Sequence, residues 1–124
     1  MARVMIVDDA VTVRMYHREL VEALGHQVVE AENGIEALEK ALGADWGLFL
    51  VDVNMPKMDG YRLVREMRAG EELRAVPVVM VSTEAGPGDR EQAWAAGANF
   101  YLVKPVRPET LQAVVRALAG EVAS

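Results

Sequence analysis

The chain has 124 residues, 52% of them hydrophobic, and a formal net charge of −6. This length and composition predict one compact domain with its own core and argue against disorder. A nucleic-acid backbone would repel the negative charge, so we expect no DNA or RNA binding, and the absence of cysteine excludes thiol catalysis, Cys-based zinc sites and disulfides.

Short apolar segments rich in Val and Ile alternate along the chain with segments of helical periodicity. We expect strands at residues 4–7, 28–31, 48–51, 78–81 and 100–103. The helical segments end near glycines, which commonly follow the last turn of a helix. The expected helices are a first one with Val13, His17, Leu20 and Leu24 on one face and Gly25 at its end, a second from Gly34 to Gly43, a third from Tyr61 to Gly70, a fourth capped by Asp89 and ending at Gly97, and a fifth from Pro108 to Gly120.

Strands that alternate with helices and lack polar alternation predict a parallel sheet with both faces covered. Five such pairs in about 120 residues favour the flavodoxin-like (βα)5 doubly wound fold, with strand order 2-1-3-4-5. No linker or repeat interrupts residues 1–124, so we expect a single domain. No segment approaches the roughly 18 to 20 apolar residues of a membrane span, and we expect a cytoplasmic monomer that does not bind membranes.

Carboxylates follow two of the strands that this order makes neighbours. Asp8 and Asp9 end the first strand, and Asp52 ends the third. An acid after a strand often caps a helix or forms a turn, but two strands ending alike favour a shared site. Two carboxylates about 5 Å apart repel by about 3 kcal/mol at an effective dielectric near 20. Either a cation binds there or one of the acids stays protonated.

The other strand ends supply groups that suit phosphoryl transfer. Ser82 ends the fourth strand, and Lys104 follows the fifth, from which its ammonium group can reach the acids as a counter-ion. Oxygen ligands without His or Cys indicate Mg²⁺, with Mn²⁺ as the alternative. A divalent cation, an ammonium group and a hydroxyl around one carboxylate suit transfer of a phosphoryl group to Asp52 as nucleophile.

Four motifs at the strand ends together resemble the receiver domain of the two-component response regulators. They are VDD at 7–9, VDVNMPKMDG at 51–60, VSTEA at 81–85 and YLVKP at 101–105. The resemblance covers essentially the whole chain. It implies a signalling switch in which Asp52 accepts a phosphoryl group from a histidine kinase, with self-catalysed transfer and autodephosphorylation and no metabolic activity.

The resemblance also assigns roles to individual residues. It implies metal ligation by Asp9, Asp52 and the backbone carbonyl of Asn54, with Asp8 acting largely through water. Ser82 and Lys104 would contact the phosphoryl group, and Tyr101 would turn from solvent toward the interior as the aromatic switch. The residues that flank the route of the attacking water are Asn54 and Glu84, and the Lys104–Pro105 peptide bond is expected to be cis.

Among receivers, the resemblance is closest to the stand-alone chemotaxis group typified by CheY, through VTVRMYHREL, Asn54 and STEAG. It implies a partner on the surface of the fourth helix, fifth strand and fifth helix, which in that group is the flagellar motor switch, and a phosphatase that acts on the protein. Two features depart from the group. Val53 stands where a tryptophan is expected, and GPG at 86–88 replaces a basic stretch, which leaves the partner open.

Three alternatives remain open at this point. A haloacid-dehalogenase-like phosphatase also uses Mg²⁺ and an aspartyl nucleophile, but it has D-x-D on its first strand and a cap domain. A degenerate receiver could act as a constitutive interaction domain, although Asp52, Ser82 and Lys104 are all present. The chain could also be a receiver domain excised from a longer regulator. His17 and His26 are interpreted as helix-face and loop residues, because no second ligand stands at metal-binding spacing.

Overall fold

The computed structural model describes residues 2–119, which form five strands and five helices in strict alternation. The strands are β1 (Arg3–Val7), β2 (Gln27–Ala31), β3 (Leu48–Asp52), β4 (Val78–Ser82) and β5 (Phe100–Val103). The helices are α1 (Val11–Glu22), α2 (Gly34–Ala41), α3 (Gly60–Ala69), α4 (Pro87–Ala96) and α5 (Pro108–Ala119).

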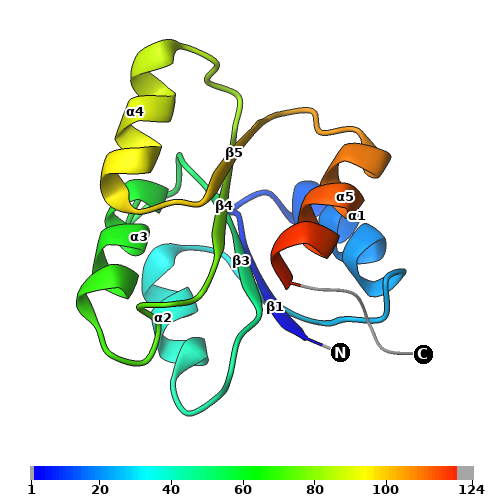
Figure 1. Ribbon diagram of the computed structural model, residues 1–124, viewed down its shortest axis with the longest axis horizontal. Helices are drawn as coiled ribbons and strands as arrows, with labels where there is room; N and C mark the ends of the chain where they lie inside the picture. The colour runs from blue at the N-terminus through cyan, green and yellow to red at the C-terminus, as the bar shows by residue number, and fades with distance from the viewer. Residues whose placement is uncertain (1, 120–124) are drawn as a thin grey trace.

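All strands pair in parallel in the order β2-β1-β3-β4-β5, which confirms the predicted doubly wound fold. Figure 1 shows α2, α3 and α4 on one face of the sheet and α1 and α5 on the other. Because β1 and β3 are neighbours whose crossovers leave on opposite faces, a crevice opens beyond their carboxyl ends. This geometry brings the ends of separate strands to one site.

Alternate residues of the strands supply two hydrophobic cores. Met5, Val7 and Phe49 pack beneath α2, α3 and α4, whereas Val4 and Ile6 pack beneath α1 and α5. Strands buried on both faces have no polar alternation, which explains the continuous Val-rich and Leu-rich segments of the sequence. The rigid, water-excluding sheet holds the residues at its edge in fixed positions.

Local capping explains where several helices begin, and it corrects one prediction. The side chain of Asn33 accepts a hydrogen bond from the Glu36 amide at the start of α2. Asp89, predicted as the cap of the fourth helix, lies instead in the first turn of α4, which begins at Pro87 after Gly86. Its carboxylate accepts a hydrogen bond from the Gly86 amide at 3.0 Å, so the acid stabilises the helix start from inside.

Other boundaries differ from the predicted ones by a few residues. β3 and β4 each extend one residue beyond the apolar segments 48–51 and 78–81, so that Asp52 and Ser82 end their strands as predicted. Helix α1 ends at Glu22, and a turn carries the chain to Gly25, which has a φ of 90°. The predicted cis peptide bond between Lys104 and Pro105 is confirmed.

The two tryptophans lie in different places, Trp46 at the edge of the core and Trp94 on the surface. Trp46 packs at the edge of the core, donates a hydrogen bond to the Ala41 carbonyl and contacts the Phe49 ring. Trp94 is 49% exposed on α4. Within residues 2–119, no helix combines the length and apolar character that crossing a membrane requires.

Candidate functional site

Three carboxylates converge in the crevice at the carboxyl edge of β1 and β3. One oxygen each from Asp8, Asp9 and Asp52 can be chosen so that all three lie within 4.8 Å of one another. Asp8 and Asp52 are 3% and 7% exposed, whereas Asp9 is open to solvent. The site is therefore a nearly buried acidic pair with a third, accessible acid at its mouth.

Lys104 spans the two buried acids. Its Nζ lies 2.8 Å from Asp8 Oδ2 and 3.2 Å from Asp52 Oδ1. Burial opposes the charged form of this lysine, but the hydrogen bond to Asp8 and the charge of Asp52 outweigh that effect and raise its pKa. The ammonium group is thus a fixed positive charge beside Asp52.

The Asp52 carboxylate is held in an unfavourable environment. Burial is the main cause, and the charge of Asp8 adds to it, so the pKa of Asp52 rises to about 6 despite the opposing charge of Lys104. One ammonium group does not neutralise three acids. The cluster offers only carboxylate oxygens and retains excess negative charge, so the donor set fits a hard divalent cation such as Mg²⁺.

The backbone around Asp52 is fixed from below by Gly60. The Gly60 amide donates a 2.8 Å hydrogen bond to the Val53 carbonyl. A Cβ atom at position 60 would collide with the Asp52 backbone oxygen, so only glycine permits this close approach. Asp59 then caps α3 by accepting a hydrogen bond from the Arg62 amide. Asp59 is therefore needed to begin α3, and Gly60 is needed because the Asp52 backbone lies against it.

A second group of residues forms around the loop that follows β4. Ser82 is completely buried, and its Oγ accepts a 3.0 Å hydrogen bond from the Glu84 amide. The Tyr101 hydroxyl donates a 2.7 Å hydrogen bond to the Glu84 carbonyl. The Glu84 backbone therefore connects the serine of β4 to the tyrosine of β5, although the Glu84 side chain itself is exposed.

Tyr101 differs from its predicted position in the resting protein. The expected switch begins with the Tyr101 ring in solvent, whereas the side chain here is 6% exposed and packs into the core. The Arg90 guanidinium lies 5.6 Å from the ring centroid and covers it. The hydrogen bond to Glu84 and this cation–π contact both stabilise the inward orientation.

The remaining predicted residues lie around these two groups. Asn54 is exposed on the loop after β3, two residues from Asp52, and Pro105 continues the bend after Lys104. His17 is a helix-face residue as predicted, and burial lowers its pKa. His26 precedes β2 and is more than a surface loop residue, because it is buried and its Nδ1 accepts a hydrogen bond from the Ala2 amide.

Arg14 is the residue of this region that the sequence reasoning missed. It lies on the buried face of α1, 7% exposed, and its Nη1 donates a hydrogen bond to the Asp8 carbonyl. The available signal was its spacing, because Arg14 stands three residues before His17 and seven before Val21 on the same helix face. A charged side chain on a buried helix face needs a hydrogen-bond acceptor close by, so an arginine at this position predicts a buried acceptor.

Comparisons with known proteins agree with this architecture. A family model for the response regulator receiver domain matches residues 4–116. The chain is 37% identical over 120 residues to the chemotaxis protein CheY1 of Helicobacter pylori, covering 95% of this chain and 97% of that protein.

Solved structures give the same result. The chemotaxis response regulator CheY4 of Vibrio cholerae superposes with a TM-score of 0.90 at 36% identity, covering 95% of this chain and 98% of that one. The receiver domain of the sensor histidine kinase PA1611 of Pseudomonas aeruginosa superposes with a TM-score of 0.88 at 32% identity and coverages of 97% and 98%. That receiver domain holds a magnesium ion in its active-site cleft.

Proposed function

The chain belongs to the receiver domains of response regulators and is a CheY-like chemotaxis signalling protein, and we propose that it switches by phosphorylation of Asp52. The observation that carries this proposal is the position of Lys104, whose ammonium group lies between Asp8 and Asp52. A nucleophilic carboxylate, a fixed cation and an acidic cluster beside it make up the groups that phosphoryl transfer requires.

The acidic cluster is the expected site for Mg²⁺. Asp9, Asp52 and the Asn54 carbonyl would hold the ion directly and Asp8 through water, with Mn²⁺ as a substitute. The ion, when bound, supplies positive charge to the phosphoryl oxygens. The magnesium-bound receiver domain from Pseudomonas aeruginosa supports this assignment, as does the all-oxygen donor set.

The chain's own residues would then act as follows. An Asp52 oxygen attacks the phosphorus of a phosphohistidine on a histidine kinase, and the phosphorus–nitrogen bond breaks. The histidine, already protonated on its other ring nitrogen, leaves as neutral imidazole. A carboxylate needs no general base for this attack, so orientation and charge supply the catalysis. Lys104 compensates the charge on the transferred group, and the Ser82 hydroxyl donates a hydrogen bond to it. Asn54 and Glu84 flank the water that later hydrolyses the acyl phosphate.

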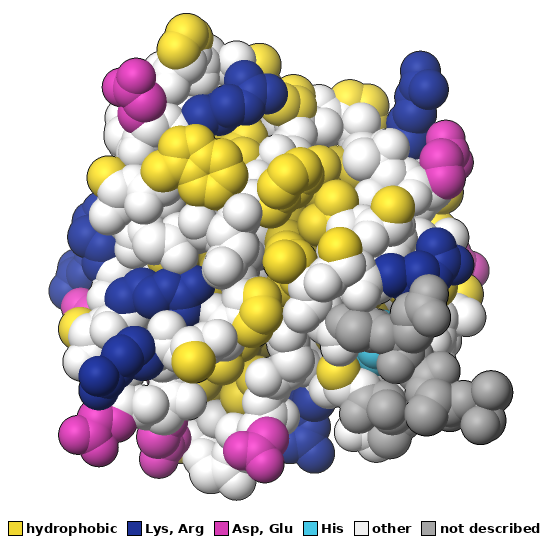
Figure 2. Space-filling model, viewed as in Figure 1, with side chains coloured by type: hydrophobic (Ala, Val, Ile, Leu, Met, Phe, Trp, Pro, Cys, Tyr) yellow, Lys and Arg dark blue, Asp and Glu magenta, His cyan; other side chains and the backbone are white. Residues whose placement is uncertain are grey.

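The output surface of the proposed switch comprises α4, β5 and α5. Figure 1 shows β5 in front, between α4 and α5. In the same view, Figure 2 shows hydrophobic side chains gathered along the middle of this face, with lysine and arginine on both sides. Trp94 and Phe100 are 49% and 43% exposed on α4 and β5. We propose that a downstream protein, the flagellar motor switch in a chemotaxis pathway, binds here, and that a phosphatase ends the signal.

Labelling tests the proposal directly. With millimolar Mg²⁺, a small acyl phosphate should phosphorylate the protein on one residue, and borohydride trapping followed by mass spectrometry should locate it at Asp52. Asp52→Asn should remain unlabelled. Label that persists in this variant, or no label in the parent protein, would contradict the assignment.

The same phosphorylated and unphosphorylated protein distinguishes the alternative functions. Receiver domains are signalling proteins and not metabolic enzymes, so small phosphomonoesters should not be turned over, in contrast to a haloacid-dehalogenase-like phosphatase. A degenerate receiver would bind its partner equally with and without the label. We propose that residues 1–124 form one receiver domain that acts as a monomer in the cytoplasm.

A further inference from the structure

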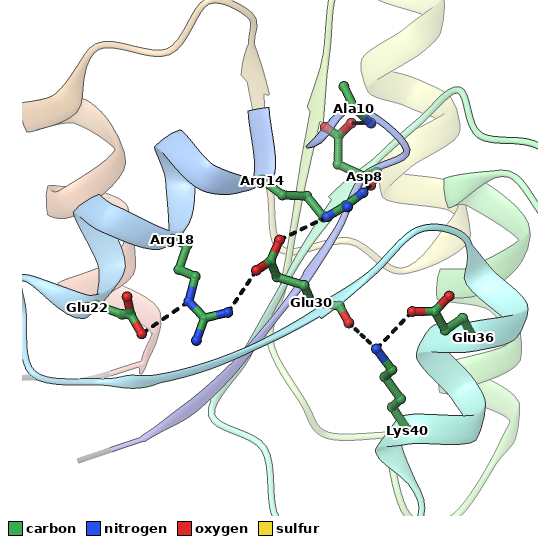
Figure 3. A network of polar contacts seen from close by, with 8 residues as sticks. All are labelled: Asp8, Ala10, Arg14, Arg18, Glu22, Glu30, Glu36 and Lys40. Carbon is green, nitrogen blue, oxygen red and sulfur yellow. Dashed lines mark hydrogen bonds and ion pairs between the residues drawn. The ribbon is translucent and has the colours of Figure 1, made fainter. Parts of the chain in front are cut away.

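Arg14 lies directly behind the acidic cluster and is part of a polar network that Figure 3 shows from close by. The guanidinium is buried, and its Nη1 donates a hydrogen bond to the backbone carbonyl of Asp8. That carbonyl belongs to the peptide group that joins Asp8 to Asp9. The arginine therefore contacts the acidic site through the backbone rather than through a carboxylate.

The orientation of Arg14 is itself fixed by β2. Its Nε donates a 2.9 Å hydrogen bond to Glu30 Oε1. The other carboxylate oxygen of Glu30 accepts a 2.7 Å hydrogen bond from Arg18 Nη1, and Arg18 also pairs with Glu22 at 3.2 Å (Figure 3). Glu30 is therefore held on both oxygens, and it presents one of them to the buried end of the network.

Asp8 is constrained at every polar atom. Its amide donates to the Ala31 carbonyl at 3.1 Å. Its Oδ1 accepts from the Ala10 amide at 2.9 Å, and its Oδ2 accepts from Lys104 at 2.8 Å. The backbone carbonyl is the remaining acceptor, and Arg14 satisfies it. Rotation of the peptide group after Asp8 would break this last contact and would also reorient the Asp9 side chain.

We propose that Arg14, oriented by Glu30, is a positioning residue that fixes the Asp8–Asp9 peptide group so that the carboxylates converge on a divalent cation. This inference rests on the proposed function, because it assumes that the cluster binds Mg²⁺. Removal of a residue that hydrogen-bonds to a metal ligand typically weakens metal binding 10- to 100-fold. Arg14 acts on the ligands through the backbone of the chain that carries them.

Charge and position predict opposite effects, which makes the proposal testable. If Arg14 contributed only its positive charge, its removal would make the site more negative and would strengthen cation binding. If Arg14 fixes the ligand geometry, its removal weakens binding in spite of the gain in negative charge. The sign of the change in Mg²⁺ affinity therefore separates the two roles.

The experiment is titration of Mg²⁺ into the folded protein by calorimetry at constant pH and ionic strength. We expect Arg14→Met to weaken Mg²⁺ binding about tenfold. The double variant Arg14→Met/Glu30→Gln keeps the net charge of the parent protein and should show a similar loss. Arg14→Lys keeps the charge but cannot reach both acceptors with a rigid fork, so it should restore only part of the affinity.

Arg18→Met is the matched control, because Arg18 binds the same Glu30 from the same helix without touching Asp8. It should leave the Mg²⁺ affinity within about twofold of the parent value, because the contact between Glu30 Oε1 and Arg14 remains. Unchanged or tighter binding in Arg14→Met and in the double variant would overturn the proposal. Complete restoration by Arg14→Lys would overturn the role of Glu30 in the proposal, since a single ammonium donor would then fix the peptide group without the guanidinium fork.

A second variant keeps the test decisive if Arg14→Met fails to fold. Glu30→Gln retains the arginine but weakens its anchor. Glu36→Gln removes an equal charge from α2, where Glu36 pairs with Lys40 and has no hydrogen bond to Arg14. Weaker Mg²⁺ binding in Glu30→Gln than in Glu36→Gln supports the proposal, and equal binding overturns it. Failure of the parent protein to bind millimolar Mg²⁺ would instead refute the proposed function itself.

Discussion

At the scale of single residues, the ionised Asp52 carboxylate lowers the stability of the folded protein. Its carboxylate is 7% exposed beside Asp8, and the pKa of about 6 follows from burial first and from the charge of Asp8 second. A group with a raised pKa favours the folded state only when protonated. The stabilisation is complete below the unfolded pKa of about 4 and is lost as the pH rises through about 6.

Asp52→Asn should therefore stabilise the metal-free protein at neutral and alkaline pH. In the presence of a chelator at pH 8, the free energy of unfolding should rise by about 3 kcal/mol, and the gain should fall to roughly half at pH 5, where the parent carboxyl is mostly protonated. Urea denaturation across this pH range measures both values. A gain that does not vary with pH would assign the effect to packing instead.

We expect the exposed Glu84 side chain to govern a different property, the lifetime of the phosphoryl group on Asp52. It stands two residues beyond Ser82, where an acidic group can orient a water for attack on the acyl phosphate. Glu84→Leu should slow the decay of the phosphorylated protein several-fold after donor removal. Glu91→Leu removes an equally exposed acid from α4 and should leave the decay unchanged. Equal decay in the parent protein and both variants would show that water reaches the site by another route.

The acids also explain an expected response to metal. Mg²⁺ at 100 times its dissociation constant should stabilise the folded protein by about 2.7 kcal/mol. Asp9 is the accessible member of the cluster, so Asp9→Ala should abolish most of the Mg²⁺-dependent rise in melting temperature while changing the metal-free value little. A full increment in this variant would remove Asp9 from the site.

At the scale of elements, Arg68 joins three segments on the face of the sheet that α3 and α4 cover. Its guanidinium donates to the carbonyls of Gly97 at 2.9 Å and Val76 at 2.7 Å, and to Asn99 Oδ1 at 3.0 Å. Gly97 has a φ of 110°, and a Cβ there would meet Arg68 Cγ at 2.7 Å. The end of α3, the approach to β4 and the turn before β5 are thus held by one side chain.

Arg68→Met should destabilise the protein by about 3 kcal/mol, because it leaves several partly buried acceptors without their charged donor. Arg65→Met, on the exposed side of the same helix, should change stability by less than about 0.5 kcal/mol. Chemical denaturation compares the two variants. Since Arg68 lies outside the acidic cluster, Mg²⁺ binding should survive in both, and a loss of binding in Arg68→Met would show that the effect spreads to the site.

The elements also show how far the sequence alone could lead. Strand order and strand ends were predictable because the Val-rich segments, the helix periodicity and the fixed handedness of crossovers leave few arrangements. Arg14, Arg68 and the orientation of Tyr101 were not. The spacing of Arg14 indicates only that it lies on a buried helix face. Which backbone carbonyl lies within reach of each of these side chains depends on another element, and no spacing along the chain encodes that distance. The start of α4 was misplaced because Asp89 stabilises a helix from its first turn as readily as from its cap.

At the scale of the whole molecule, the proposed switch requires a signal to travel from Asp52 to the surface of α4, β5 and α5. The Glu84 backbone provides a physical connection, with Ser82 on its amide and Tyr101 on its carbonyl. A phosphoryl group would draw the Ser82 hydroxyl toward itself, and a hydrogen bond to a charged group contributes about 1.5–3 kcal/mol. Complete switching from 1:99 to 99:1 needs about 5.5 kcal/mol.

This difference implies that phosphorylation alone shifts the population only in part, and that a bound partner completes the change. In this structure the Tyr101 ring is already inward, 6% exposed and hydrogen-bonded, so phosphorylation is not needed to turn it inward. What remains to be moved is the β4–α4 loop together with α4, which Arg90 ties to the Tyr101 ring.

Trp94 can report that movement, because it is 49% exposed on α4 and Trp46 is the only other tryptophan of the sequence. In a Trp46→Phe background, phosphorylation by a small acyl phosphate with Mg²⁺ should shift the Trp94 fluorescence. Ser82→Ala should still accept the label but lose most of the shift, and Tyr101→Phe should lose it as well. If Glu84 links the two side chains, the double variant loses no more than either single variant, a strongly non-additive cycle. Additive losses would mean that the hydroxyl of Ser82 and that of Tyr101 act on α4 independently, and that the Glu84 backbone is not the route between them.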